Sequence, residues 1–245
     1  DHVVWRPEDL YVYQYDGTID RQIPYAVVFP GDTDEVARVV RLCSELGVAV
    51  TPRGAGTGLS GGAVPAERGV VVATGRMRRI LEMDAENRLA VVQPGVPNIQ
   101  ISEAAAPYGL FFAPDPSSQK ACTIGGNVAE NAGGPHCLAL GVTTNHVLGL
   151  TVVTAAGDIV NLGGRVADSF GYDLRGAFIG SEGTLGIATE IVVKLLPVPA
   201  SVVTLLAIFD GVREASETVS SIIAAGMVPA AMEMMDRVTL QAAEA

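Results

Sequence analysis

The chain has 245 residues, 49% of them hydrophobic, which is enough to bury a stable core without metal ions or disulfides. Its formal net charge of −11 argues against nucleic acid as a partner, because a phosphate backbone is usually bound by a basic face. Three cysteines without C-x-x-C spacing, Cys43, Cys122 and Cys137, indicate neither a disulfide framework nor a zinc site. With no apolar stretch of membrane-spanning length and no signal-peptide pattern, we expect a cytoplasmic protein that has no transmembrane segment.

The first predicted elements form a strand–helix–strand unit. Tyr25–Phe29 is typical of a buried strand, and Asp32 follows as the N-cap of a helix with Glu35 at the capping-box position. Gly47 ends that helix, and Val48–Thr51 is the next strand. Such a unit predicts a parallel pair of strands with a right-handed crossover.

Further strands and a second helix are predicted up to about residue 113. The strands are Gly69–Ala73 and Leu89–Val92. The helix starts at Pro97, ends at Gly109 and should bury one face, which carries Ile101, Ala104, Ala105 and Tyr108.

The C-terminal half is richer in predicted strands, at Val147–Ala155, Asp158–Val160 and Ile187–Leu196. After a boundary at Pro197–Ala200, a strand (Val202–Phe209) and a helix from about Val212 begin a third unit, which is too small to bury a core alone. We therefore predict an α+β fold. Residues 1–198 form one domain of two α/β subdomains, at about 1–118 and 119–198, and residues 199–245 are the incomplete beginning of another.

A glycine-rich stretch, PRGAGTGLSGGA, follows the strand that ends at Thr51. Such glycines let successive N–H groups turn toward one anion, and Arg53 adds a cation. The stretch satisfies G-x-G-x-x-G with Glu82 near the distance of a ribose-binding acid, but Pro65 and Gly69 interrupt the helix that a nicotinamide-binding Rossmann unit requires. A Walker A loop is excluded because Gly62 stands in place of the lysine, and a plain hairpin-like connection is the remaining alternative.

A second glycine-rich stretch, TIGGNVAENAGG, covers residues 123–134. Its glycines again permit close backbone approach, while Thr123, Asn127 and Asn131 offer side-chain hydrogen bonds. Two such loops suit a dinucleotide, whose diphosphate and ring edge both need backbone contacts. A third motif, GSEGTLGI, places Glu182 ahead of a strand, where the alternative is an ordinary surface turn.

Taken together and in this order, PRGAGTGLSGG, APDPSS, TIGGNVAENAGG, FGYDL and IGSEGTLGI resemble the FAD-binding domain of the vanillyl-alcohol oxidase and p-cresol methylhydroxylase superfamily. Within it the chain is most similar to the glycolate oxidase flavin subunit and the FAD-linked D-lactate dehydrogenases, over about Tyr25 to Glu233. The resemblance implies two α/β subdomains with FAD between them and then an α+β cap domain that binds substrate. Residues 199–245 would be the truncated start of that cap.

The resemblance also assigns candidate FAD contacts. The first loop would hold the diphosphate, through Pro52, Arg53, Gly54, Ala55, Gly56, Thr57, Gly58, Leu59, Gly61 and Gly62. The flavin and the remaining phosphate contacts would fall to Pro114, Asp115, Ser117, Ser118, Thr123, Gly125, Gly126, Asn127, Asn131 and Gly133, and the adenine end to Glu182 and Ile187. Relatives that attach flavin covalently carry histidine near Thr57, so we expect non-covalent FAD.

The expected activity is oxidation of a small 2-hydroxy acid such as glycolate or D-lactate. Its partners would be the acid, the C-terminal cap segment and an electron-transfer subunit, which could hold the protein at the membrane periphery. No catalytic residue is identified: the cap would supply them, this part alone should be inactive, and His136 is interpreted as structural. The alternatives are a non-catalytic FAD-carrying subunit of a larger complex and, less favoured, a nicotinamide-dependent dehydrogenase.

Overall fold

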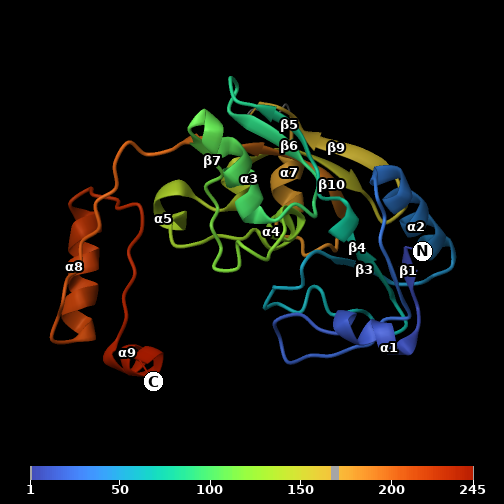
Figure 1. Cartoon of the computed structure of the whole chain (residues 1–245), viewed down its shortest axis with the longest axis horizontal. Helices are drawn as coiled ribbons and strands as arrows, with labels where there is room; N and C mark the ends of the chain where they lie inside the picture. The colour runs from blue at the N-terminus through green and yellow to red at the C-terminus, as the bar shows by residue number, and fades with distance from the viewer. Residues whose placement is uncertain (1, 167–170, 245) are drawn as a thin grey trace.

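The computed structural model describes residues 2–166 and 171–244, and Figure 1 shows two sheets with helices packed around them. The smaller sheet has the strand order β1-β2-β4-β3, with β1 (Val3–Val4), β2 (Ala26–Val28), β4 (Val70–Ala73) and β3 (Val50–Arg53). The last three run parallel and β1 is antiparallel to β2. The predicted parallel direction of β2 and β3 is confirmed, but the two do not pair directly because β4 lies between them.

Between β2 and β3 lies α2 (Thr33–Glu45), the helix predicted from its capping residues. The Asp32 carboxylate accepts a hydrogen bond from the N–H of Glu35 at 2.8 Å. Glu35 in turn accepts from the N–H of Gly31 at 2.7 Å, one residue before the position that a standard capping box would use. Gly47, with φ of +63°, ends the helix as predicted, because a left-handed residue favours glycine.

The larger sheet is antiparallel, in the order β5-β6-β10-β8-β9, with β5 (Ile80–Asp84), β6 (Leu89–Val92), β10 (Ile187–Lys194), β8 (Val147–Val153) and β9 (Ile159–Gly163). Strand β5 was not predicted. Both β5 and β6 precede residue 118, so the division between the sheets falls between β4 and β5 and not near that residue. The Pro-rich stretch that suggested a boundary is a turn, and the pairing of β6 with β10 is too distant in sequence to show locally.

Several helices pack against this sheet, on the side of the functional site described below. They are α3 (Asn98–Ala105), α4 (Ile124–Glu130), α5 (Cys137–Leu140), α6 (Thr143–His146) and α7 (Leu174–Phe178). Two short strands, β7 (Leu110–Phe111) and β11 (Leu196–Pro197), form a separate antiparallel pair. Ile101 and Ala105 are buried as predicted, but Tyr108 is 57% exposed. The prediction for Tyr108 is wrong because the α-helix ends at Ala105, and a 3₁₀ turn containing Pro107 rotates the ring outward.

The two sheets share a hydrophobic core. Helix α2 contributes Val36 and Val40, which pack against Met77 after β4 and against Val153 and Ile187 at the ends of β8 and β10. All five side chains are buried. This cluster joins α2 and the end of β4 to the end of β8 and the start of β10, next to the site described below.

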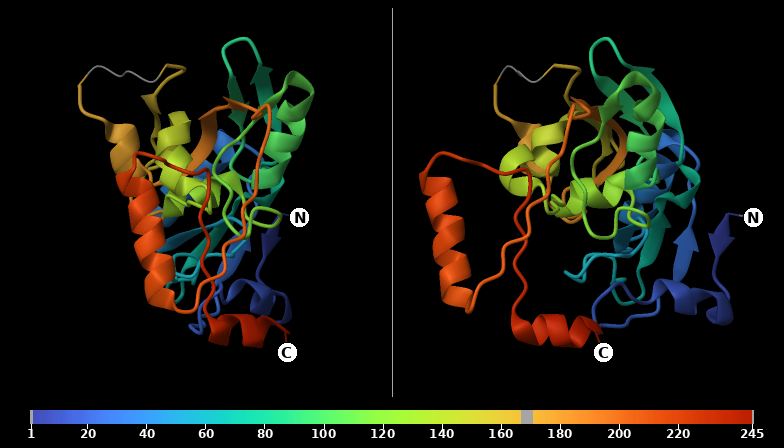
Figure 2. Two further views of the ribbon diagram at one scale, coloured as in Figure 1. Left: turned by 90° about the vertical axis from the view of Figure 1, so that its left-hand side faces the viewer. Right: turned by 60° about the vertical axis from the view of Figure 1, so that its left-hand side comes forward.

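The chain outside these sheets begins with α1 (Pro7–Leu10) and a 3₁₀ turn (Tyr11–Tyr13), and ends with α8 (Val212–Ala224) and α9 (Arg237–Glu244). Figures 1 and 2 show α8 standing apart from both sheets. The helix predicted from about Val212 is confirmed, but the strand predicted at Val202–Phe209 is wrong. Leu205 and Leu206 there are each 89% exposed, because no described strand lies alongside to accept the backbone hydrogen bonds of a new one.

No helix among the described residues is long and apolar enough to cross a membrane.

Candidate functional site

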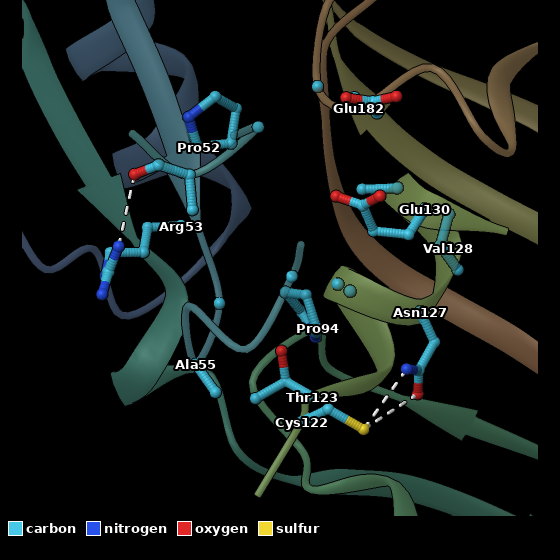
Figure 3. Close-up of a pocket in the computed structure, with 18 of the residues that line it drawn as sticks. Pro52, Arg53, Ala55, Pro94, Cys122, Thr123, Asn127, Val128, Glu130 and Glu182 are labelled. Carbon is cyan, nitrogen blue, oxygen red and sulfur yellow. Dashed lines mark hydrogen bonds between the residues drawn. The ribbon is translucent and has the colours of Figure 1, made fainter. Parts of the chain in front are cut away.

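A cleft of about 270 Å³ lies where the two sheets meet. One wall is the end of β3 with the glycine-rich loop that follows it, and the other comprises the start of α4 and the turn before β10. Figure 3 shows Pro52, Arg53 and Ala55 on the first wall and Asn127, Val128 and Glu130 on the second, with Thr123 between them. Segments far apart in the sequence therefore share one concave surface.

Both glycine-rich stretches line this cleft, and Gly58 and Gly126 are both part of its surface. The candidate residues in its lining are Pro52, Arg53, Gly54, Ala55, Gly56, Thr57, Gly58, Leu59, Gly62, Ser118, Thr123, Gly125, Gly126, Asn127, Glu182 and Ile187. The candidates outside the lining are Gly61, Pro114, Asp115, Ser117, Asn131 and Gly133. Phe170 of the FGYDL motif lies outside the described residues.

Two glycines of the cleft are required by close approach to neighbouring segments. A Cβ on Gly54 would collide with the hydroxyl of Thr123, and a Cβ on Gly125 would lie 2.6 Å from the side chain of Pro94. Gly126 differs, because the nearest atom to its Cβ position is Thr123 Oγ1 at 3.6 Å and the space beyond is the cleft. Gly54 thus lets the two walls meet, Gly125 lets α4 approach the segment after β6, and Gly126 leaves room for a ligand.

Thr123 provides the clearest unused polar group in the cleft. Its residue is only 8% exposed, and its Oγ1 is buried with no hydrogen-bond partner among the described residues. Buried polar atoms are nearly always hydrogen-bonded, so an unpaired hydroxyl facing a cleft indicates a ligand partner.

The two asparagines predicted to offer hydrogen bonds are instead used inside the protein. Asn127 accepts from Asn98 at 2.9 Å and donates to the sulfur of Cys122 at 3.3 Å, while Asn131 accepts from the N–H of Thr144 at 2.9 Å. The stretch is also not a loop throughout, because α4 occupies most of it. Asn127 and Asn131 therefore fix the shape of this wall.

Arg53 does not aim its charge into the cleft. Its guanidinium is turned away from Glu130 and Glu182, as Figure 3 shows, and donates to the carbonyl oxygens of Tyr15 at 2.7 Å and Ala63 at 3.2 Å. Burial lowers the pKa of Arg53, but an arginine stays protonated at any physiological pH. The guanidinium of Arg53, which the sequence predicted to lie beside the FAD diphosphate, therefore lies beneath the glycine-rich loop.

Two carboxylates face the cleft across Gly62. The Cβ position of Gly62 lies 3.3 Å from Glu130 Oε1 and 3.4 Å from Glu182 Oε2. Glu130 also accepts from the hydroxyl of Ser60 at 2.8 Å. Carboxylates repel a phosphate but accept hydrogen bonds from hydroxyl and amino groups, so a dinucleotide would place its sugar or base here and its diphosphate elsewhere in the cleft.

The segment Pro114–Ser118 touches the cleft only through Pro116 and Ser118. Pro114 is buried and accepts a hydrogen bond from Asn98 at 3.0 Å, whereas Ser117 is exposed. Asp115 lies 2.6 Å from Nδ1 of His136. This contact of His136 joins residues 21 positions apart and is visible only in the tertiary structure.

The structure adds cleft residues that sequence analysis did not single out, among them Thr74, Pro94, Cys122, Val128, Glu130, Phe178, Gly183 and Gly186. Glu130 could have been found, since it lies inside the second glycine-rich stretch. Phe178 carries no local signal. Among the described residues, no cluster of three or more histidine, cysteine, aspartate or glutamate side chains could hold a metal ion.

The geometry also bears on the nicotinamide-binding alternative. Residues 54–69, all described, contain no helix, so the helix N-terminus of a Rossmann unit is missing. Glu82, the candidate ribose acid, lies on β5 and pairs with Arg165 outside the cleft lining.

A family model described as an FAD binding domain matches residues 24–163, more than half of the chain. The chain belongs to this FAD-binding family. A second model, described as the C-terminal domain of FAD linked oxidases, matches residues 198–245. FAD is the cofactor of the family, and the resemblance inferred from the glycine-rich motifs is confirmed.

Named relatives of this FAD-binding chain include glycolate oxidase subunit GlcD of Escherichia coli, 49% identical over 238 residues, covering 97% of this chain and 48% of the relative. GlcD of Bacillus subtilis is 51% identical over 231 residues, with coverages of 94% and 49%. A D-lactate dehydrogenase of Archaeoglobus fulgidus is 38% identical over 247 residues, with coverages of 98% and 55%. The chain spans about half the length of these relatives.

Among solved structures, alkyldihydroxyacetonephosphate synthase superimposes with a TM-score of 0.80 at 23% identity, covering 94% of this chain and 44% of the other. At that identity the match shows the shared fold alone.

The cleft of this FAD-binding chain fits its cofactor. Gly126 faces open space that any larger side chain would fill, and Thr123 holds a buried hydroxyl without a partner. The first loop supplies closely spaced N–H groups that suit a diphosphate.

Proposed function

We propose that the chain is the flavin-binding part of an FAD-dependent oxidoreductase that oxidises a small 2-hydroxy acid such as glycolate or D-lactate. The observation that carries this proposal is the meeting of the two glycine-rich stretches in one cleft, with Gly58 on one wall and Gly126 on the other. Relatives named for glycolate and D-lactate support the substrate class.

In this proposal, residues 1–198 hold FAD and residues 199–245 begin the domain that covers the substrate. The exposed apolar side chains of the segment Val202–Phe209 support such a role, because they need a covering partner. Parts of the protein outside this cleft would bind the substrate carboxylate and the electron-transfer subunit. We also propose a reducing, cytoplasmic location, because the spacing of the three cysteines does not indicate a disulfide framework.

We assign the first loop to the diphosphate and Glu130 with Glu182 to the ribose or adenine. When bound, FAD supplies the hydride acceptor that oxidation of a 2-hydroxy acid needs. The chain's own task is to orient the cofactor with backbone N–H groups and the Thr123 hydroxyl, and to exclude water by enclosing it between the two walls. Thr57, an unreactive hydroxyl on the first wall, is consistent with FAD held non-covalently.

Gly126 provides the direct test of cofactor binding. Its Cβ position has only one neighbour, at 3.6 Å, so a leucine there should leave the fold intact and fill the cleft. Gly126→Leu should therefore lose the visible flavin spectrum that the wild-type chain acquires with FAD. Gly164→Leu is the matched control, since its Cβ position has no neighbour within 4 Å and lies outside the cleft lining. Full flavin occupancy in Gly126→Leu would refute the assignment.

Turnover tests the reaction. The holoprotein in its full-length context, given glycolate or D-lactate and an artificial electron acceptor, should reduce the acceptor, and acid precipitation should release all of the FAD. Bound FAD with no turnover on either acid would contradict the proposed activity and favour a non-catalytic FAD-carrying subunit.

A further inference from the structure

The glycine-rich loop is supported from behind by residues 13–18, which we call the N-terminal support. These residues precede the range 24–163 that matches the FAD-binding family, so no family description assigns them a role. We propose that the N-terminal support positions the loop for FAD, with Asp16 and Arg53 as positioning residues that do not touch the cofactor. The inference rests on the proposed FAD site.

The loop needs such support because it has no regular structure of its own. Residues 54–69 form neither helix nor strand, and several are glycines with wide backbone freedom. A loop that must be ordered when its ligand binds loses affinity, whereas a loop already held in place does not.

The support contacts the loop directly at its beginning and middle, and Arg53 extends the connection to the loop's end. At the beginning, Arg53 donates from Nη1 to the carbonyl oxygen of Tyr15 at 2.7 Å. The same nitrogen reaches the carbonyl oxygen of Ala63, at the loop's end, at 3.2 Å. In the middle, the N–H of Gly17 donates to the carbonyl oxygen of Gly58 at 2.8 Å. The arginine thus ties both ends of the loop to one point.

The fit around Arg53 is tight on both sides. Its guanidinium lies 5.9 Å from the ring centre of Tyr13 and is packed beneath Gly56, where any Cβ would collide with it. The residue is 7% exposed. A Cβ on Gly17 would lie 2.7 Å from the carbonyl oxygen of Gly58, so Gly17 too has no room for a side chain. Arg53 therefore lines the cleft but holds its guanidinium charge under the loop, bonded to the carbonyl oxygens of Tyr15 and Ala63.

Asp16 completes the arrangement with a buried negative charge, at 5% exposure. Its Oδ1 accepts from the N–H and hydroxyl of Thr18 at 2.8 and 2.6 Å. Burial alone would raise the pKa of Asp16, but hydrogen bonds from Thr18 and the backbone N–H groups of Ala63 and Gly61 outweigh it and lower the pKa. Its Oδ2 has no hydrogen-bond partner among the described residues.

Ser60 and Gly61 lie outside the cleft lining, whereas Leu59 and Gly62 on either side belong to it. The N–H of Gly61 is among the groups that lower the pKa of Asp16, so it lies on the side of the loop near Asp16. We assign the diphosphate to the N–H groups of Gly54 to Thr57, which line the cleft. The support thus contacts the later part of the loop as well as its beginning.

The test compares three variants with two controls. Asp16→Asn removes the charge, Arg53→Ala removes the tie between the loop ends, and Gly17→Ala disturbs the middle contact without changing any charge. Asp84→Asn is the control for aspartate, since Asp84 also bonds a nearby residue, Asn87, but lies outside the cleft. Gly164→Ala is the control for glycine, in open space.

Two measurements are made on each protein: the FAD dissociation constant, and amide hydrogen exchange without FAD. The three variants should weaken FAD binding about 10- to 100-fold and speed exchange in residues 54–63, with β8 and β10 still protected. The controls should change neither. Unchanged FAD affinity in Asp16→Asn, or faster exchange spread evenly over the core, would overturn the proposal.

Failure of the proposed FAD site would show differently. A wild-type chain that binds no FAD refutes that site, while exchange of the loop amides still reports whether residues 13–18 hold the loop.

Discussion

Replacing Gly54 by alanine should weaken FAD binding, because the added methyl group would collide with the hydroxyl of Thr123 on the opposite wall. Gly54 has no left-handed backbone angle, so alanine adds no backbone strain and the effect isolates the contact. Removing the hydroxyl with Thr123→Ala should relieve the collision. The pair therefore tests whether the walls meet at this point.

The magnitude follows from the geometry. Cβ atoms essentially never approach another heavy atom within 3.0 Å, so either the hydroxyl or the loop must retreat. Overpacking of this kind costs about 1–3 kcal/mol, which corresponds to about 5- to 150-fold in affinity if it falls on the binding geometry. Thr123→Ala alone should weaken binding as well, since it removes a candidate ligand contact.

The assay is titration of each cofactor-free protein with FAD, followed by quenching of flavin fluorescence, with unfolding curves as the check on stability. The double variant should bind FAD more tightly than the two single effects predict together, by about 1 kcal/mol or more. Strictly additive losses would refute the contact, and wild-type affinity in Gly54→Ala would refute the role of this loop end.

Three further predictions concern the scaffold. Ile191 is fully buried at the centre of β10, so Ile191→Ala should lower the free energy of unfolding by about 2–5 kcal/mol, as urea titration would measure. A loss below about 1 kcal/mol would contradict the place of Ile191 in the core. Asp32→Ala should cost about 0.5–2 kcal/mol in the same titration, because it removes the cap hydrogen bond to Glu35, and no loss would show that the cap is unimportant. Burial lowers the pKa of His146 below its ordinary 6.5, although its Nε2–H bond to Leu140 opposes this, so the unfolded chain is protonated first as pH falls. Stability should therefore drop as pH falls through 6.5 toward the lowered pKa, and His146→Gln should flatten that slope; an unchanged slope would contradict the assignment.

Local patterns in the sequence predicted the elements whose determinants are local. Helix α2 was placed by Asp32, Glu35 and Gly47, and the structure shows the cap bond and the left-handed glycine. Strands β4 and β6 were placed by short runs of branched apolar residues. Each of these elements carries its own start and stop signals within a few residues.

Elements set by distant partners were missed or misplaced. Strand β5 mixes Ile80 with charged Glu82 and Asp84, and it forms because β6 offers a partner. The segment Val202–Phe209 has strand composition but no described neighbour to pair with. The expected boundary near residue 118 came from composition, whereas the pairing of β6 with β10 decides which sheet the strands join.

The candidate site shows the same division. Glycine density predicted both walls of the cleft, because close backbone approach requires residues without Cβ atoms. Side-chain roles were not predictable: Arg53 and Asn127 look like ligand contacts in the sequence, yet both are engaged by protein atoms. Tertiary contacts alone reveal that Thr123 keeps an unused hydroxyl.

The most direct test of the account is amide hydrogen exchange of the wild-type chain with and without FAD. Binding should slow exchange in both glycine-rich segments, residues 54–58 and 123–127, at the same FAD concentration, since one molecule would contact both walls. Protection of only one segment, or of neither, would contradict the claim that they form a single cofactor site.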